Sequence, residues 1–200
     1  KVLTPEWNFE WKEAKSLNKN DYLLLKTDYP QIKEYIKLDQ IYFLNENIAY
    51  LLGIFVSEGS ISNDYGKKRR PRIRISNGSR EVLKKVAFIL REEFGYLPTI
   101  EKRYNPLSKN PIYIVRINRK NINEFLADNF NLRGKKALTK EIPLKIFTSS
   151  KSVIFSFISG LIDGDGSVHI RRNQIHYGSI SEALVQQVQI LLLHQGIFSR

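Results

Sequence analysis

Apolar residues follow two different periodicities along the chain, and together they predict an α+β fold. Around residues 47–58, apolar and small residues recur at helical spacing, which predicts a helix with one buried face. Residues 72–76 alternate strictly, with isoleucines on one side, as in a half-buried strand. Helical spacing returns from Ser79 to about residue 93, where the serine is suited to cap the helix. The other elements expected in this part are strands near 99–104 and 111–118 and a helix at 121–130.

The same pattern occurs twice. Residues 51–60 (LLGIFVSEGS) resemble residues 158–167 (ISGLIDGDGS) at a constant offset of 107 residues. The helical pattern that begins at Ser79 returns at Ser181, at an offset of 102 residues. The first copy therefore reads αββαββα, and by analogy the second lacks its last strand pair and helix. We expect a duplicated, pseudo-twofold fold with antiparallel sheets.

We divide the chain accordingly into a small β-rich N-terminal flank and two repeats. The expected boundaries are 1–45 for the flank, 46–150 for the first repeat and 151–200 for the second, incomplete repeat. The sequence does not begin with methionine, so we expect it to be a piece of a longer protein.

Charge and composition narrow the function classes. The chain has 32 lysines and arginines against 20 acidic residues, a formal net charge of +12. Such an excess attracts polyanions, of which nucleic acid is the commonest. The absence of cysteine excludes disulfides, cysteine-ligated zinc and thiol catalysis. No apolar run reaches the ~20 residues that span a bilayer, and the first residues lack a signal peptide's apolar stretch. We expect an intracellular, cytoplasmic protein.

The candidate chemistry lies at the ends of the two repeated helices. Glu58 and Asp165 occupy equivalent positions there. A helix C-terminus carries partial negative charge, so an acid is unfavourable unless a cation offsets it. Magnesium prefers carboxylate oxygens, and the small residues Gly53 and Gly160 would let the two helices pack closely and bring the acids together. In the alternative, the glycines after the acids only end the helices in the left-handed conformation, and the acids are solvated.

The two motifs resemble those of the LAGLIDADG homing endonucleases. Leu51–Gly59 and Ile158–Gly166 align with the nine-residue signature without gaps, although Val56 stands where the signature has its first acid. Residues 140–143 (KEIP) resemble the connector that precedes the second motif in this family. The resemblance covers roughly residues 46–200, and two motif copies at this spacing make it specific.

The resemblance implies an enzyme that cuts both strands of double-stranded DNA at a long, non-palindromic site, acting as a monomer with internal pseudo-twofold symmetry. It makes Glu58 and Asp165 the catalytic residues and the ligands of Mg²⁺ (or Mn²⁺), and it places Gly53 and Gly160 in the helix interface. The antiparallel sheets would lie in the major groove. The basic residues and the histidine expected to contact DNA are Lys67, Lys68, Arg69, Arg70, Arg72, Arg74, Lys102, Arg103, Arg116, His169, Arg171 and Arg172. The other two histidines, His176 and His194, we interpret as structural or solvent-facing.

Two rival functions stay open at this point. A protein with this fold can bind DNA or assist RNA splicing without cutting, as a maturase does. Residues 3–25 also resemble part of an intein splicing domain, which associates the chain with inteins. Trp7 stands at the expected histidine position and no nucleophilic first residue is visible, so we do not expect this chain to splice. The alternative for the flank is a β-rich extension that helps to grip DNA.

Overall fold

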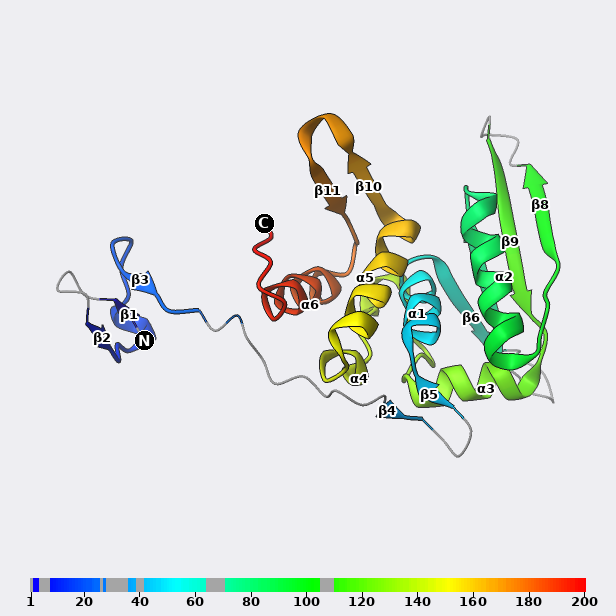
Figure 1. Ribbon diagram of the computed structural model, residues 1–200, viewed down its shortest axis with the longest axis horizontal. Helices are drawn as coiled ribbons and strands as arrows, with labels where there is room; N and C mark the ends of the chain where they lie inside the picture. The colour runs from blue at the N-terminus through cyan, green and yellow to red at the C-terminus, as the bar shows by residue number, and fades with distance from the viewer. Residues whose placement is uncertain are drawn as a thin grey trace.

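The computed structural model describes residues 2–3, 8–25, 27, 36–38, 42–63, 71–104 and 110–200. It has the predicted α+β architecture with antiparallel sheets (Figure 1). Two helices, α1 (Glu46–Glu58) and α5 (Lys151–Asp165), lie side by side at its centre and make the most extensive contact between described elements. Their facing residues form the middle of the hydrophobic core, so each repeat is packed against the other through its motif helix.

The first repeat has the predicted αββαββα order. After α1 come β6 (Gly59–Asn63), β7 (Pro71–Asn77), α2 (Arg80–Phe94), β8 (Ile100–Tyr104), β9 (Pro111–Ile117) and α3 (Lys120–Asn129). The four strands form one antiparallel sheet in the order β6-β7-β9-β8, and α2 packs on one side of it. Ile73 and Ile75 are buried on that side, as their alternation predicts.

The second repeat follows through a 3-10 turn, η2 (Ala137–Thr139), and a short helix, α4 (Leu144–Phe147). It comprises α5, β10 (Gly166–His169), η3 (Ile170–Arg172), β11 (Gln174–Tyr177) and α6 (Glu182–Leu193). The serine caps are equivalent in the two repeats: the Ser79 hydroxyl accepts from the Val82 N–H at 3.5 Å, and the Ser181 hydroxyl accepts from the Leu184 N–H at 3.3 Å.

Residues 167–171 (SVHIR) alternate in the sequence as the residues of a strand do, but the structure forms a strand over only the first part of this segment. The strand ends at His169, because the chain reverses through η3 and Asn173, which has the left-handed φ of 49° that asparagine tolerates. Arg171 and Arg172 therefore lie at the tip of a β-hairpin, which projects from the end of α5 (Figure 1).

The glycines after the acids do end the two motif helices, but the expected left-handed conformation was wrong. Gly59 and Gly166 are extended, with φ of −82° and −94°, so neither is left-handed. Their small size matters instead: a Cβ would lie 2.4 Å from the Phe55 carbonyl oxygen at position 59 and 2.6 Å from the Ile162 carbonyl oxygen at position 166. Because each glycine lacks a Cβ, the strand that begins there can pack directly against the last turn of the motif helix.

The N-terminal flank contains short strands. In a three-stranded sheet, β1 (Val2–Leu3) lies between β2 (Phe9–Glu10) and β3 (Tyr22–Leu23), and η1 (Ala14–Ser16) lies between β2 and β3 in sequence. Next, β4 (Ile36–Lys37) pairs with β5 (Phe43–Leu44), directly before α1. Trp7 lies outside the described residues.

Among the helices described, none is long and apolar enough to cross a membrane.

Candidate active site and nucleic-acid interface

The two motif helices cross where each carries a glycine. A Cβ on Gly53 would lie 2.1 Å from the Phe157 carbonyl oxygen, and a Cβ on Gly160 would lie 2.3 Å from the Tyr50 carbonyl oxygen. The two glycine Cα atoms face each other across this contact. Only glycine lets the two backbones approach so closely, and the close approach brings the helix ends together.

Two hydrogen bonds between side chains of α1 and groups of the C-terminal half of α5 link the helices. The buried Ser57 hydroxyl donates to the Leu161 carbonyl oxygen at 3.0 Å. The Tyr50 hydroxyl donates to Asp163 Oδ2 at 2.7 Å, and burial, followed by the nearby Asp163 carboxylate, raises the pKa of Tyr50. A hydrogen bond to a charged group is among the stronger ones in proteins, so the position of α5 along α1 is well defined.

Glu58 and Asp165 end these helices close enough for their charges to interact. The pKa of Glu58 is raised to about 7, mainly by burial and in second place by the Asp165 carboxylate. Lys140 acts to lower it. Burial also raises the pKa of Asp165, again against the effect of Lys140. The negative charges of both carboxylates are therefore incompletely neutralised. Carboxyl groups with pKa values raised in this way occur at functional sites more often than at structural ones.

Lys140 is a site residue that sequence reasoning missed. Its ammonium group donates to the Ser57 carbonyl oxygen, one residue before Glu58. Burial lowers the pKa of Lys140, and the two carboxylates act in the opposite direction. The signal in the sequence was the resemblance of residues 140–143 to a connector, which said nothing about the direction of the lysine side chain.

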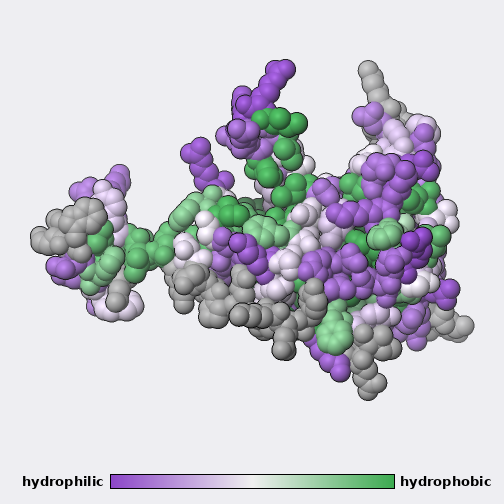
Figure 2. Space-filling model, in the orientation of Figure 1, coloured by the Kyte–Doolittle hydropathy of each residue, from purple (hydrophilic) through white to green (hydrophobic). Residues whose placement is uncertain are grey.

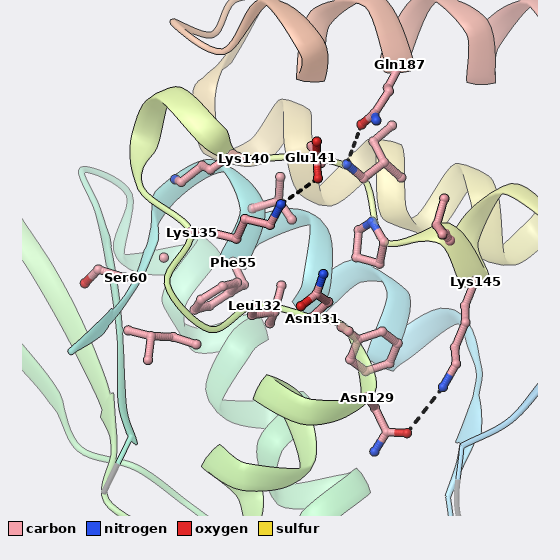
Figure 3. A pocket seen from close by; sticks show the side chains of 17 residues that line it. Phe55, Ser60, Asn129, Asn131, Leu132, Lys135, Lys140, Glu141, Lys145 and Gln187 are labelled. Carbon is pink, nitrogen blue, oxygen red and sulfur yellow. Dashed lines mark hydrogen bonds and ion pairs between the residues drawn. The ribbon is translucent and has the colours of Figure 1, made fainter. Parts of the chain in front are cut away.

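The connector that carries Lys140 lines a cavity of about 400 Å³ (Figure 3). The Ser181 hydroxyl donates to the Lys140 carbonyl oxygen at 2.7 Å, and the Ile142 N–H donates to Gln187 Oε1 at 2.7 Å. Lys135 and Glu141 form an ion pair of 2.6 Å. These contacts tie the connector to α6, so the position of the lysine depends on the second repeat as well as the first.

Tyr177 is the second residue that the sequence did not single out. Burial is the main cause that raises its pKa to about 12, and the Asp165 carboxylate adds to the effect, whereas nearby Ser57 lowers it. Within the described part of the chain its hydroxyl lacks a hydrogen-bond partner of good geometry. A buried hydroxyl beside a carboxylate needs a partner, and a polar ligand atom would supply one.

The donor set fits a hard divalent cation. Two carboxylates interact with one ammonium group, so the cluster has excess negative charge, and the buried Tyr177 hydroxyl beside Asp165 lacks a hydrogen-bond partner among the described residues. Magnesium is commonly held by one or two carboxylates, with water and substrate phosphates as its other ligands. Among the described residues, no group of three or more His, Cys, Asp or Glu side chains is placed to hold a metal. The site therefore suits Mg²⁺ or Mn²⁺ more than a tightly caged structural metal.

The first sheet presents arginines on its outer side. Arg72 and Arg74 are exposed on β7, opposite the buried isoleucines, and Arg116 on β9 is the direct neighbour of Arg74. Glu101 on β8 forms ion pairs with Arg103, at 3.2 Å, and with Arg116. The Glu101 carboxylate is thus shared by two guanidinium groups, and Arg72 and Arg74 add further positive charge on this side of the sheet.

Other predicted contacts are placed differently. Lys102 lies on the helix-covered side, where Tyr104 raises its pKa and Arg80 of α2 lowers it. Lys67, Lys68, Arg69 and Arg70 lie outside the described residues. His169, Arg171 and Arg172 are exposed on the β10–β11 hairpin, which stands out from the body with a hollow beside it in Figure 2.

The fold is a duplicated unit with two motifs. Its two motif helices pack through glycines and bring two equivalent carboxylates together, so the two repeats share one composite site. The sequence matches the model of the LAGLIDADG-like domain over residues 45–128 and 152–200. The chain belongs to this family.

Solved structures share the fold. The homing endonuclease I-DmoI, studied in mesophilic variants, has a TM-score of 0.57 and 17% identity, with 78% of this chain and 80% of that chain covered. I-DmoI in complex with DNA and Mn has a TM-score of 0.56 and 17% identity, with 78% and 81% covered.

Curated relatives carry varied names. The chain is 28% identical over 186 residues to the DNA-directed RNA polymerase subunit Rpo1C of Methanocaldococcus jannaschii, covering 91% of this chain and 19% of the relative. It is 30% identical over 156 residues to a DNA polymerase of Thermococcus hydrothermalis, covering 77% and 8%. It is 29% identical over 184 residues to the ATP-dependent DNA helicase Hel308 of Thermococcus kodakarensis, covering 87% and 15%. The chain thus spans less than a fifth of each of these proteins.

Proposed function

We propose that the protein is a site-specific endonuclease that hydrolyses both strands of duplex DNA and depends on Mg²⁺ or Mn²⁺. The observation that carries this proposal is the convergence of Glu58 and Asp165 at the ends of the glycine-packed helices, with Lys140 beside them. Phosphodiester hydrolysis needs charge stabilisation and a positioned water more than a protein nucleophile, and this cluster offers both. The DNA and Mn in the I-DmoI complex support the same reading.

The residues of this chain have distinct tasks in that reaction. Glu58 and Asp165 would hold the cation, which when bound lowers the pKa of the attacking water and neutralises charge on the phosphate. Because the two acids occupy equivalent positions in the repeats, each would act on one strand of a duplex centred on the pseudo-twofold axis. The Lys140 ammonium group interacts with both carboxylates and would supply positive charge for the phosphate. The Tyr177 hydroxyl is free to orient water next to Asp165.

The proposed partner is double-stranded DNA with a long, non-palindromic site. The exposed arginines of the first sheet and the charged tip of the hairpin are the contact surfaces. The two surfaces present different side chains, so the two half-sites should differ in sequence. Both carboxylates come from one chain, which supports action as a monomer.

We also infer that the chain is an inserted element associated with inteins. Its relatives include an RNA polymerase subunit, a DNA polymerase and a helicase, and it matches only 8–19% of their lengths. A segment shared by proteins with such different names behaves as an insertion, and a nuclease that cuts at its own insertion point explains how it spreads. The resemblance of the flank to a splicing domain supports this interpretation.

The proposal is tested by cleavage of duplexes that the protein itself selects from a randomised DNA library. Wild type should cut the selected duplexes with Mg²⁺ and not with EDTA. Asp165→Asn should bind them with little loss of affinity but not cut. The matched control is Asp128→Asn, which changes an exposed acid paired with Arg133 on the first repeat and should cut as wild type does. Tight binding by wild type without metal-dependent cutting would instead establish a binding protein.

A further inference from the structure

The strand pair of the second repeat has the same pairing register as that of the first. In the first repeat Ser60 faces Arg74 and Ser62 faces Arg72. In the second, at offsets of 107 and 102 residues, Ser167 faces His176 and His169 faces Gln174. The exposed arginine positions of the first sheet are therefore occupied by Gln174 and His176 in the second repeat.

These hairpin residues form one contiguous polar cluster. The rings of His169 and His176 have centroids 4.7 Å apart and are inclined by 57°. His176 Nε2 lies 3.3 Å from Gln174 Oε1. All three side chains are exposed on the same side of the hairpin, and the cluster contains no arginine or lysine. The hairpin's own arginines lie at its tip, in η3.

The chemistry of the two faces differs in a way that matters for DNA. A guanidinium group pairs with guanine or neutralises a phosphate, and each phosphate contact releases counterions. A glutamine amide offers one donor and one acceptor in a plane, which matches N6 and N7 of adenine in the major groove. A neutral imidazole likewise offers one donor and one acceptor. The second face therefore suits base recognition with little dependence on salt.

We propose that Gln174 selects an adenine in the half-site bound by the second repeat, with His176 and His169 holding the amide and lining the same face. The inference rests on the proposed function, because it specifies how that nuclease distinguishes one half of its target. The histidine at position 176 thus belongs to the recognition face.

The test compares base preferences selected from randomised duplexes, with every protein carrying Asp165→Asn so that the DNA stays intact. Gln174→Ala should lose an adenine preference of about 5- to 150-fold at one or two neighbouring positions in one half of the site, with the preferences elsewhere retained. The salt dependence of binding should not change. Gln174→Glu should move the preference toward cytosine, because a carboxylate accepts from the cytosine amino group.

Two controls make the outcome specific. Gln186→Ala removes the same side chain from an exposed position on α6, where it bonds Glu182 at 3.0 Å, and should leave all preferences intact. Arg74→Ala should lower the magnitude of the salt slope by about 0.9 if that guanidinium group contacts one phosphate. If the parent protein selects a sequence and Gln174→Ala selects the same one, the inference is overturned and the proposed function stands. If the parent protein selects no sequence, both fail.

Discussion

Replacement of Gly53 by alanine tests the helix crossing on which the composite site depends. The added Cβ would lie 2.1 Å from the Phe157 carbonyl oxygen and 2.9 Å from the Gly160 Cα. A carbon–oxygen contact needs roughly 3.3 Å, so the helices must separate by about 1 Å. Overpacking of this kind costs about 3 kcal/mol at the upper end of its usual range, and alanine recovers about 1 kcal/mol of helix propensity. We expect a net loss of about 2 kcal/mol.

In a chain of this size that loss corresponds to a fall in Tm of about 4–8 °C, measured by thermal unfolding. Cleavage should fall more than DNA binding, because the separation moves Glu58 away from Asp165 while leaving both sheets intact. Gly78→Ala is the matched control, since a Cβ there meets nothing within 4 Å. A Gly53→Ala protein with the Tm and activity of wild type would refute the close crossing and, with it, the argument for a composite site.

Three further outcomes are expected. Arg72→Ala together with Arg74→Ala should weaken DNA binding and reduce the magnitude of its salt slope by up to about 1.8, as measured by binding titrations at several salt concentrations; an unchanged slope would move the phosphate contacts elsewhere. Tyr50→Phe should destabilise the protein by about 1.5–3 kcal/mol in denaturant unfolding, because it leaves the Asp163 carboxylate without its hydrogen bond; no change would mean that this bond is replaced by water. The raised pKa of Glu58 means that the folded state holds its proton more tightly than the unfolded state, so metal-free protein should lose stability as pH rises from about 4.5 to about 7. Glu58→Gln in EDTA should flatten that loss in melting curves recorded across the range, and an identical pH profile in both proteins would exclude the site as its source.

The sequence predicted those elements whose signal is local. The alternation of Ile73 and Ile75 and the periodicity after Ser79 each extend over several residues, and the structure has a strand and a helix there. The hairpin was predicted less well, because the reversal at Asn173 interrupts an alternation that would otherwise continue. The conformation of Gly59 was misjudged, since an extended and a left-handed glycine look the same in a sequence.

The residues of the candidate site also differ in how well the sequence predicted them. The repeat itself places Glu58 and Asp165 at equivalent positions, so no three-dimensional information was needed to single them out. Lys140 and Tyr177 approach the acids from a connector and from a strand that lie 25 and 12 residues away from Asp165 in the sequence. Their approach depends on how the second repeat packs, through contacts such as that of Ser181 with the connector backbone. No periodicity encodes such contacts.

The two motif helices have also diverged where they meet, and this sets a limit on the symmetry of the site. Ser57, whose hydroxyl crosses to the other helix, corresponds to Gly164 in the second motif, where a Cβ would meet Ser57 at 2.3 Å. Asp163, which accepts from Tyr50, corresponds to Val56. Each bond therefore exists once, and two identical motifs would lose both. The contact between α1 and α5 is complementary because the two helices carry different residues there. Glu58 and Asp165 therefore have unequal surroundings.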